Sequence, residues 1–508
     1  MITLDGKSLT LEQLVSIARF NEKVEIAQES QKKVIEAAAF VKEIAENDLP
    51  VYGINTGFGQ LANIKIKKTE VNQLQINLLI SHACGMGDIL EIEKVRAMMA
   101  LRINALIQGY SGLRLETILK MVEFLNKGIT PVVFEKGSLG ASGDLALLSH
   151  MSLPLVGLGE VFYQNKRYKA EEGLKLAGIK PLDNLVAKEG LSLINGTQAM
   201  NAIGALTLYD GLRVLDFANV SYALSMEALL GVTDALDDKV HQIRNQKGQI
   251  EMAKIMRAHL KGSTYTTKKH NERVQDAYSL RCSPQVHGAS KDALDHILDI
   301  VEREMNAVTD NPLIFLKEKE AISAGNFHGQ ALALAFDYLG IALAELANIS
   351  ERRIERLVNP NLSNGLPAFL AKDPGLNSGF MIVQYTAAAL VSENKVLAHP
   401  ASVDSIPSSA NQEDHVSMGS ISARKASSIL DHTRKVIALE FLTAIQGIDF
   451  RAKMTLGQTT KKAYEYFRKE IPFLVNDTVM YPLMHQAEAL LKDNNFYQAV
   501  VKGAMIND

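Results

Sequence analysis

Residues 331–349 read Ala-Leu-Ala-Leu-Ala-Phe-Asp-Tyr-Leu-Gly-Ile-Ala-Leu-Ala-Glu-Leu-Ala-Asn-Ile, and this stretch decides the fold. It is apolar nearly all round a helix, and its alanines let neighbouring helices approach closely. Because Asp337 and Glu345 interrupt it, it predicts a buried bundle helix and not a membrane span. A helix of this kind needs neighbours on every side, which favours a bundle core completed by other subunits.

Helical patterning continues through most of the chain. Residues 21–47 are rich in Glu, Ala, Lys and Ile at helical spacing, and Pro50 is expected to end this helix. Near the C-terminus, Ile429, Val436 and Leu439 fall on one helical face. The sequence therefore predicts a mainly α fold built on a long-helix bundle. The other long helices are expected over 90–107, 284–308, 326–358, 376–397 and 418–446.

Strand signals are few and short. Residues 161–163 and 167–168 flank a polar turn, and 313–316 faces 321–323 across a charged turn. These patterns predict two short β-hairpins beside the helices. We find no internal repeat, low-complexity tract or flexible linker that would divide the chain.

Composition narrows the class of protein. The chain has 508 residues with 54 Lys plus Arg against 57 Asp plus Glu, and no basic stripe, so nucleic acid is not an expected partner. Cys84 and Cys282 have neither metal-type nor disulfide-type spacing, which is typical of a reducing cytoplasm. Residues 1–6 lack the features of a signal peptide. We expect a soluble cytoplasmic protein with no membrane anchor.

The most specific chemistry lies in the loop Gly137-Ser138-Leu139-Gly140-Ala141-Ser142-Gly143-Asp144. In a tight bend, the amide nitrogen of Gly143, unhindered by a Cβ, can attack the carbonyl carbon of Ala141. Loss of one water from the ring and a second from Ser142 leaves an electrophilic 4-methylidene-imidazol-5-one. Asp144 is predicted to cap the next helix, whose positive end would draw electrons from the ring. An ordinary helix start or an anion site is the alternative.

Three other segments offer polar side chains to a site. The glycine-rich loop 52–59 presents Tyr52 as an acid or base, and the alternative is a plain turn with a packed tyrosine. Its glycines do not fit the dinucleotide fingerprint, so phosphate binding is not expected. His82 ends a predicted helix and Asn195 precedes one, and helix capping is the alternative role for each.

A further group of candidates follows in the second half of the chain. Gln275, Tyr278 and Arg281 would share a helical face. Arg281 offers a two-pronged guanidinium for a substrate carboxylate, although a surface ion pair is the alternative. Asn311 and Phe327 add an amide and an aromatic ring on turns.

Residues 411–415, Asn-Gln-Glu-Asp-His, place ionisable and amide groups just before the predicted helix 418–446. Glu413 is well placed to engage a positively charged amine or an imidazole. A solvated helix start is the alternative explanation for this cluster.

Taken in order, these motifs resemble the aromatic amino acid ammonia-lyase family over essentially the whole chain. The resemblance implies the long-helix fold of the aspartase- and fumarase-like superfamily, and a homotetramer whose active sites are shared between subunits. It also implies an Ala141–Gly143 cross-link with Ser142 as dehydroalanine, and no metal, nucleotide or other external cofactor. The matching segments are 52–59, 81–82, 137–144, 193–198, 275–288, 309–312, 325–329 and 405–419.

We expect the chain to form a single lyase unit over residues 1–508. Within it, 1–190 would be the half that carries the catalytic loop, and 191–508 the half that carries the long-helix bundle.

Two positions indicate the substrate. Members selective for phenylalanine or tyrosine tend to have Phe-Leu or His-Leu where this chain has Ser81-His82, and Asn-Gln-Asp where residues 412–415 read Gln-Glu-Asp-His. A buried imidazole needs polar partners for both nitrogens, whereas a phenyl ring needs none. We therefore expect non-oxidative deamination of L-histidine to trans-urocanate, the first step of histidine degradation. A tyrosine ammonia-lyase or aminomutase on the same scaffold is the alternative.

The resemblance also implies a division of roles. Arg281, helped by Asn195, would bind the substrate carboxylate, and His82 and Glu413 would hold the imidazole. Tyr52 is the candidate base for the β-proton, which requires a lowered phenol pKa, and Glu413 is the alternative base. Whether the amine or the imidazole carbon adds to the electrophile is left open. The remaining residues expected to support ring formation or line the pocket are Gln275, Tyr278, Asn311 and Phe327.

Overall fold

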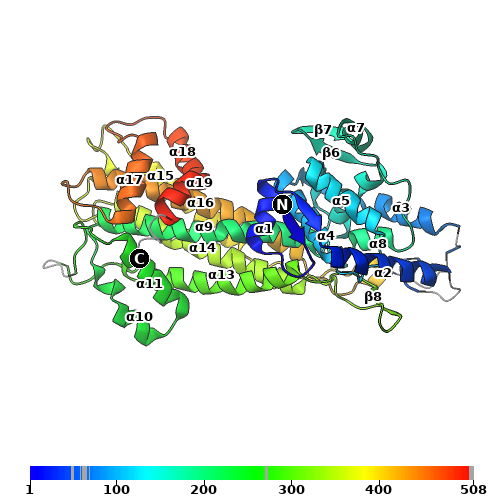
Figure 1. Cartoon of the computed structure of the whole chain (residues 1–508). Helices are drawn as coiled ribbons and strands as arrows, with labels where there is room; N and C mark the ends of the chain where they lie inside the picture. Colours follow the sequence, from blue (N-terminus) through cyan, green and yellow to red (C-terminus); the bar gives the residue numbers. More distant parts are fainter. Residues whose placement is uncertain (47–50, 58, 60–65, 68, 269–272, 503–508) are drawn as a thin grey trace. The chain divides into compact units, whose positions relative to one another are not determined.

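The computed structural model describes every residue except 47–50, 58, 60–65, 68, 269–272 and 503–508. The described chain is mainly helical with a few short strands, which confirms the predicted fold class (Figure 1). Its residues divide into two compact units that interleave along the sequence. The expectation of a single lyase unit with halves 1–190 and 191–508 stays a prediction. Unit 1 comprises Met1–Thr207, Leu298–Asp337 and Pro400–Arg424, and unit 2 comprises Leu208–Ile297, Tyr338–His399 and Lys425–Asp508.

Unit 1 combines short helices with small sheets. Strands β6 and β7 form one predicted hairpin, and β8 and β9 form the other. The helices of unit 1 are α1 (Leu11–Arg19), α2 (Gln28–Glu46), α3 (Val71–His82), α4 (Ile92–Leu106), α5 (Leu115–Lys127), α6 (Leu145–Ser152), α7 (Ala170–Leu176) and α8 (Glu189–Ile194). Its strands are β1 (Ile2–Leu4), β2 (Val24–Ile26), β3 (Met86–Ile89), β4 (Thr130–Pro131), β5 (Phe134–Lys136), β6 (Glu160–Tyr163), β7 (Lys166–Lys169), β8 (Leu313–Phe315) and β9 (Glu320–Ile322).

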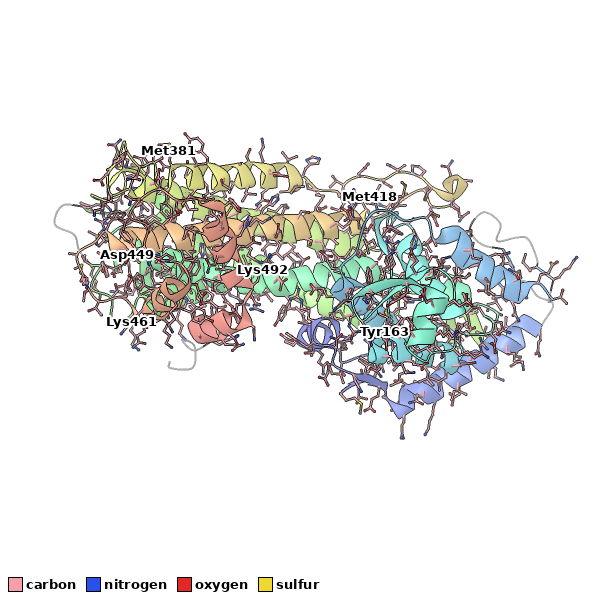
Figure 2. The ribbon with its side chains drawn as sticks, turned by 90° about the horizontal axis from the view of Figure 1, so that it is seen from above. Tyr163, Met381, Met418, Asp449, Lys461 and Lys492 are labelled. Carbon is pink, nitrogen blue, oxygen red and sulfur yellow. The ribbon has the colours of Figure 1, made fainter. Side chains whose placement is uncertain are left out.

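Four long helices contribute residues to both units: α9 (Gln198–Ala228), α13 (Ser283–Met305), α14 (Gln330–Val358) and α16 (Gly419–Asp449). Met418 precedes α16 and Asp449 ends it, as Figure 2 labels. The remaining helices of unit 2 are α10 (Asp238–Arg244), α11 (Lys247–His259), α12 (Tyr278–Arg281), α15 (Met381–Leu397), α17 (Gln458–Glu470), α18 (Tyr481–Lys492) and α19 (Asn494–Tyr497).

A buried ion pair ties the long helices together inside unit 2. Glu440 of α16 accepts hydrogen bonds from Arg353 Nε at 2.5 Å and Ser350 Oγ at 2.6 Å, both on α14. Ser221 of α9 donates to the same carboxylate at 2.9 Å. Arg353 and Glu440 are fully buried, and each finds its charge partner there, as a buried charge requires.

The helix predicted from the alanine-rich stretch is α14. It is long and apolar enough to cross a membrane by length and composition, but 67% of its most apolar window is buried inside the protein. Asp337, within that stretch, is buried and accepts a hydrogen bond from the backbone N–H of Ser402 at 2.8 Å. The interpretation as a core helix agrees with this burial.

The prediction of a helix over 21–47 is wrong at its start. Residues 24–26 form β2, which pairs in parallel with β1, so that Ile2 lies opposite Val24. Val24 and Ile26 are buried while Glu25 is exposed, the period of two that belongs to a strand. Helix α2 begins only at Gln28, and the predicted end at 47–50 lies outside the described residues.

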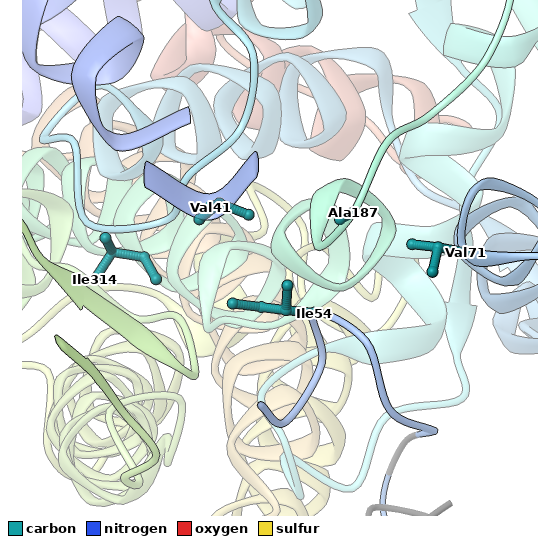
Figure 3. Packing of buried hydrophobic residues seen from close by; sticks show 5 residues of the cluster. All are labelled: Val41, Ile54, Val71, Ala187 and Ile314. Atoms are coloured by element: carbon teal, nitrogen blue, oxygen red, sulfur yellow. The ribbon is translucent and has the colours of Figure 1, made fainter. Parts of the chain in front are cut away.

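A hydrophobic cluster holds the loops of unit 1 in place. It contains Val41 of α2, Ile54, Val71 of α3, Ala187 and Ile314 of β8, each at most 8% exposed (Figure 3). Ile54 lies two residues after Tyr52, Val71 begins the helix that ends at His82, and Ala187 lies just before α8. The cluster therefore fixes the bases of three segments that lead to predicted site residues.

Candidate active site

A cavity of about 870 Å³ in unit 1 brings together most of the predicted site residues. Gln275, Tyr278 and Arg281 belong to unit 2 and are not among the described residues of its wall. The predicted residues that line it are Tyr52, His82, Ser142, Asn195, Asn311, Phe327 and Glu413.

The loop that carries Ser142 is bent at two crowded glycines. Gly143 has φ +72°, and a Cβ there would lie 2.0 Å from the carbonyl oxygen of Gly196. Gly140 has φ +67°, and a Cβ there would lie 2.2 Å from Ser417 Oγ. Only glycine fits at either position, because both the left-handed backbone and the missing space exclude a side chain. The loop thus bends at the two glycines that flank Ala141 and Ser142.

Asp144 stands at the start of α6, but it does not cap that helix with its side chain as predicted. Its Oδ2 instead accepts a hydrogen bond from the N–H of Met200 at 2.8 Å, in the first turn of α9, and its Oδ1 accepts from Ser138 Oγ at 3.0 Å. Burial raises the pKa of Asp144 to about 7, although these hydrogen bonds oppose the shift. The side chain therefore fastens the Ser142 loop to the first turn of α9.

Ser142 and Glu413 meet across the cavity. Ser142 Oγ donates a hydrogen bond to Glu413 Oε1 at 3.0 Å. The other carboxylate oxygen, Oε2, accepts from Ser408 Oγ at 2.8 Å. Residues 271 positions apart in the sequence are thus brought into contact at the hydroxyl that would be eliminated.

Tyr52 and His82 add two titratable groups to the wall. Burial, together with the nearby charge of Glu413, raises the pKa of Tyr52, and its hydroxyl accepts a hydrogen bond from the N–H of Gly59 at 3.3 Å. This shift is opposite to the lowered pKa expected of a base. Burial lowers the pKa of His82, which favours the neutral imidazole. Its Nδ1 lies 3.1 Å from Ser81 Oγ at the end of α3.

Asn195 and Asn311 form a fixed pair in the wall. Asn195 Nδ2 donates to the carbonyl oxygen of Asn311 at 3.0 Å, and Asn311 Oδ1 accepts from the N–H of Ala324 at 2.7 Å. The Asn311 carbonyl decides the orientation of the Asn195 amide, since the flipped amide would set two acceptors against each other. Asn195 Oδ1 is buried with no partner among the described residues, so this part of the wall offers an acceptor to a ligand.

A buried ionic network that the sequence analysis did not anticipate supports these asparagines. Lys188 Nζ lies 2.7 Å from Asp310 Oδ2, and both side chains are at most 1% exposed. Ser192 Oγ donates to the same oxygen at 3.0 Å, and Asp310 Oδ1 accepts from the N–H of Asn311 at 2.7 Å. The sequence gives an indication of this network, because the charged residues Lys188 and Glu189 interrupt a largely apolar run.

Other wall residues were also missed. Asn77 and Ser81 lie four residues apart on α3 and so share the helical face that carries the cavity. That spacing was visible in the sequence and could have identified Asn77. Ser409, by contrast, reaches the wall through a loop that carries no periodic signal.

Of the predicted residues of unit 2, Gln275 and Tyr278 are exposed and Arg281 is half-buried. Tyr278 is 69% exposed, and the guanidinium carbon of Arg281 lies 4.5 Å from its ring centroid, as the shared helical face predicted. Gln275 precedes α12 and so does not share that face. Arg281 Nε is buried without a hydrogen-bond partner among the described residues, which leaves a cationic donor unsatisfied.

Comparison with known proteins agrees with the fold and the site. Residues 9–469 match the family model described as aromatic amino acid lyase. This chain belongs to the aromatic amino acid lyase family. The assignment confirms the resemblance inferred from the motifs, and with it the helical lyase fold and the enzyme class of an ammonia-lyase.

Members of the family with known names are similar over nearly full length. The histidine ammonia-lyase of Alkaliphilus oremlandii is 54% identical over 501 residues, which cover 99% of this chain and 98% of the relative. The crystal structure of histidine ammonia-lyase from Trypanosoma cruzi is 42% identical with a TM-score of 0.92, covering 99% of this chain and 95% of that one. Tyrosine aminomutase from Streptomyces globisporus is 38% identical with a TM-score of 0.94, covering 99% and 98%.

Proposed function

We propose that this protein eliminates ammonia from L-histidine to give trans-urocanate. The observation that carries the proposal is the contact between Ser142, in its tightly bent Ala-Ser-Gly loop, and Glu413, across a cavity that also presents His82. The chain is 54% identical in sequence to a histidine ammonia-lyase over 99% of its length, which supports the same substrate.

The loop fits the prosthetic group that the family resemblance implies. Its formation joins Gly143 N to the carbonyl carbon of Ala141, expels the carbonyl oxygen as water, and removes the Ser142 hydroxyl and α-proton as a second water. The bend at Gly143 is consistent with that cross-link, and Asn195 Oδ1, in the wall of the same cavity as Ser142, has no partner among the described residues. Once formed, the 4-methylidene-imidazol-5-one would supply an electrophilic alkene that activates the substrate for loss of ammonia.

His82 and Glu413 would hold the substrate imidazole. A neutral His82 can either donate or accept a hydrogen bond, and the Glu413 carboxylate accepts from an imidazole N–H. Both groups face the same cavity, so the two ring nitrogens could be satisfied together. A phenylalanine ring in that place offers no N–H or O–H to His82 or Glu413, and a tyrosine ring offers a single hydroxyl, so at least one of the two groups would lose a ligand partner, which costs binding free energy.

Tyr52 would remove the β-proton as a phenolate. Because burial raises its pKa in this structure, a cation must lower that pKa when substrate is bound. The substrate ammonium and Arg281 are the candidates for this cation. Glu413 is the alternative base, since its Oε1 already accepts a proton-bearing hydroxyl.

Arg281 would bind the substrate carboxylate, with Gln275 and Tyr278 beside it. We further propose that these residues reach the cavity from another copy of the chain in a homotetramer with shared active sites. The exposure of Tyr278 and the unsatisfied Nε of Arg281 are consistent with a partner at this surface.

Two cysteines with no disulfide spacing support a cytoplasmic location.

The test is a comparison of L-histidine, L-tyrosine and L-phenylalanine as substrates of the purified protein, with Ser142→Ala as the control. Urocanate formation is followed by ultraviolet absorbance and β-amino acids by NMR. We expect turnover of L-histidine at least 100-fold above the other two, and none by Ser142→Ala. A β-tyrosine product, or faster release of the tyrosine-derived acid, would instead assign the chain to the tyrosine ammonia-lyases or aminomutases.

A further inference from the structure

Ser408 holds Glu413 by its side chain and by its backbone. Ser408 Oγ donates to Glu413 Oε2 at 2.8 Å. The two residues also form an isolated antiparallel bridge, in which Ser408 N donates to Glu413 O at 3.0 Å and Glu413 N donates to Ser408 O at 3.3 Å. The Glu413 carboxylate is thus hydrogen-bonded to Ser408, the residue five positions earlier at which the turn begins.

The turn between them is strained. Ser409, Ala410 and Asn411 have φ values of +51°, +52° and +67°, three successive side-chain-bearing residues in the left-handed region. Such a run is unfavourable for L-residues and persists only where surrounding contacts enforce it. Strain of this kind is often found beside functional sites, and here it lies next to Ser408 and Glu413.

The same turn approaches the loop that carries Tyr52. A Cβ on Gly59 would lie 2.7 Å from Ser409 Oγ, and the N–H of Gly59 donates to the hydroxyl of Tyr52 at 3.3 Å. Ser409 and Glu413 both line the cavity. The strained turn therefore forms part of the wall between two of the proposed catalytic groups.

We propose that Ser408 is a positioning residue that acts through Glu413, and this inference rests on the function proposed above. Its hydroxyl occupies Oε2 and fixes the rotation of the carboxylate, so that Oε1 faces Ser142 and the substrate. Without that bond the carboxylate can turn away, while the two backbone hydrogen bonds between Ser408 and Glu413 still close the turn. Ser408 itself does not line the cavity among the described residues.

Three single variants test this role. Ser408→Ala removes the hydroxyl, and loss of a hydrogen bond to a charged group should lower kcat/KM for L-histidine about 10- to 100-fold, mainly through kcat. Ser408→Thr keeps the hydroxyl on an extended backbone (φ −136°, ψ 178°), which suits a β-branched residue, so activity should stay within about threefold.

Ser402→Ala is the matched control in the same segment. Ser402 contacts its neighbours through its backbone: its N–H donates to Asp337 Oδ2 at 2.8 Å and its carbonyl accepts from Gln330 Nε2 at 3.4 Å. The variant should therefore keep wild-type kcat/KM within about twofold.

A double-mutant cycle separates positioning from general destabilisation. If Ser408 acts through the carboxylate, Ser408→Ala should cost no more than about twofold in a Glu413→Ala background, where no side-chain acceptor remains at position 413. An equal loss in both backgrounds, or no loss in the wild-type background, would overturn the inference while leaving the proposed function standing. Failure of the wild type to deaminate L-histidine would overturn both.

Discussion

The backbone at Gly143 leaves no room for a side chain, and the bend it permits is what the proposed chemistry needs. Ser142 lies next to this bend and donates a hydrogen bond to Glu413, so the hydroxyl that the proposed reaction would eliminate has a partner. At the scale of single residues, the proposed reactivity would depend on backbone geometry and not on any unusual side chain.

Replacing Gly143 by Ala should block ring formation. The new Cβ would lie 2.0 Å from the Gly196 carbonyl, so the loop must open and the nitrogen of residue 143 must move away from Ala141. We expect a protein of unreduced mass without deaminase activity, destabilised by at least about 2 kcal/mol. Intact mass and thermal unfolding measure both effects.

Gly128→Ala is the matched control. Gly128 has φ +73°, but a Cβ there would meet nothing within 4 Å, so only the cost of the left-handed backbone applies, about 1 kcal/mol. This variant should mature and turn over substrate normally. If Gly143→Ala matured as well as Gly128→Ala, the close approach to Gly196 would have no part in cyclisation.

Asp144 should make stability depend on pH. Its pKa is 3.8 in the unfolded chain and about 7 when folded, so the folded protein holds a proton that the unfolded chain has released. The stability contributed by this proton is fully present below pH 3.8 and is lost as pH rises through about 7. The unfolding temperature of the wild type, measured relative to that of Asp144→Asn, should therefore decrease from pH 5 to pH 8. A constant difference would show that Asp144 titrates normally.

At this scale the sequence predicted residue types better than contacts. Recognisable motifs contain most of the predicted site residues, and the structure places these at one cavity or in the loop beside it. They are the Ala-Ser-Gly loop, His82, Asn195, Asn311, Phe327 and Glu413. The sequence could not predict that the Asp144 side chain accepts a hydrogen bond from the first turn of α9, because its partner Met200 lies 56 residues away. The raised pKa of Tyr52 depends on burial, which the sequence does not show.

At the scale of elements, helix ends deliver the site residues. Helix α3 ends at His82, α8 ends just before Asn195, and Glu413 lies six residues before α16. Such positions leave side chains free to face a cavity while the helix body is packed. The stability of these helices should therefore affect the site directly.

Replacing Gln75 by Ala should loosen α8. Gln75 Oε1, fully buried on α3, accepts from the backbone N–H groups of Gly190 and Leu191 at 2.9 and 3.3 Å in the first turn of α8. Its loss leaves both donors unsatisfied, which should lower the free energy of unfolding by about 1–3 kcal/mol. Since α8 leads to Asn195, KM for L-histidine should rise as well. Chemical denaturation and steady-state kinetics test the two effects.

Gln73→Ala provides the comparison on the same helix. Gln73 is exposed, and its Nε2 donates to Asn77 Oδ1 at 2.8 Å. Its removal should change stability by no more than about 0.5 kcal/mol. Equal destabilisation by the two variants would mean that Gln75 has no special role in capping α8.

Long helices were predictable where polar residues interrupt the apolar pattern. Helices α13, α14, α15 and α16 begin and end within five residues of their predicted bounds. Helix α9 was foreseen only as a helix after Asn195, since it is buried nearly all round and lacks a polar stripe that would mark its length. Strand β2 was mistaken for helix because three residues are too few to establish a period.

At the scale of the whole molecule, the cavity of unit 1 does not by itself provide every group that the proposed reaction needs. The cavity of unit 1 contains a carboxylate and an imidazole, but the described residues of its wall include no arginine or lysine for the substrate carboxylate. Arg281, in unit 2, has an unsatisfied buried Nε. A homotetramer that shares its sites would supply this cation from another copy.

Complementation between two inactive variants tests the shared site. Ser142→Ala and Arg281→Ala should each form tetramers of four 55.7 kDa chains and each be inactive. Mixed tetramers made by co-expression should regain activity, because some sites take Ser142 from one copy and Arg281 from another. Light scattering checks the assembly. Mixed tetramers with no activity would place both residues in the same copy's site.

The proposed chemistry begins with the condensation of Ala141, Ser142 and Gly143 into the reactive group, and the intact mass of the purified, folded protein reports whether this condensation takes place. We expect a mass below that of the translated sequence by two waters, with the loss confined to a peptide that contains residues 141–143. A wild-type protein that deaminates L-histidine at full translated mass would contradict it.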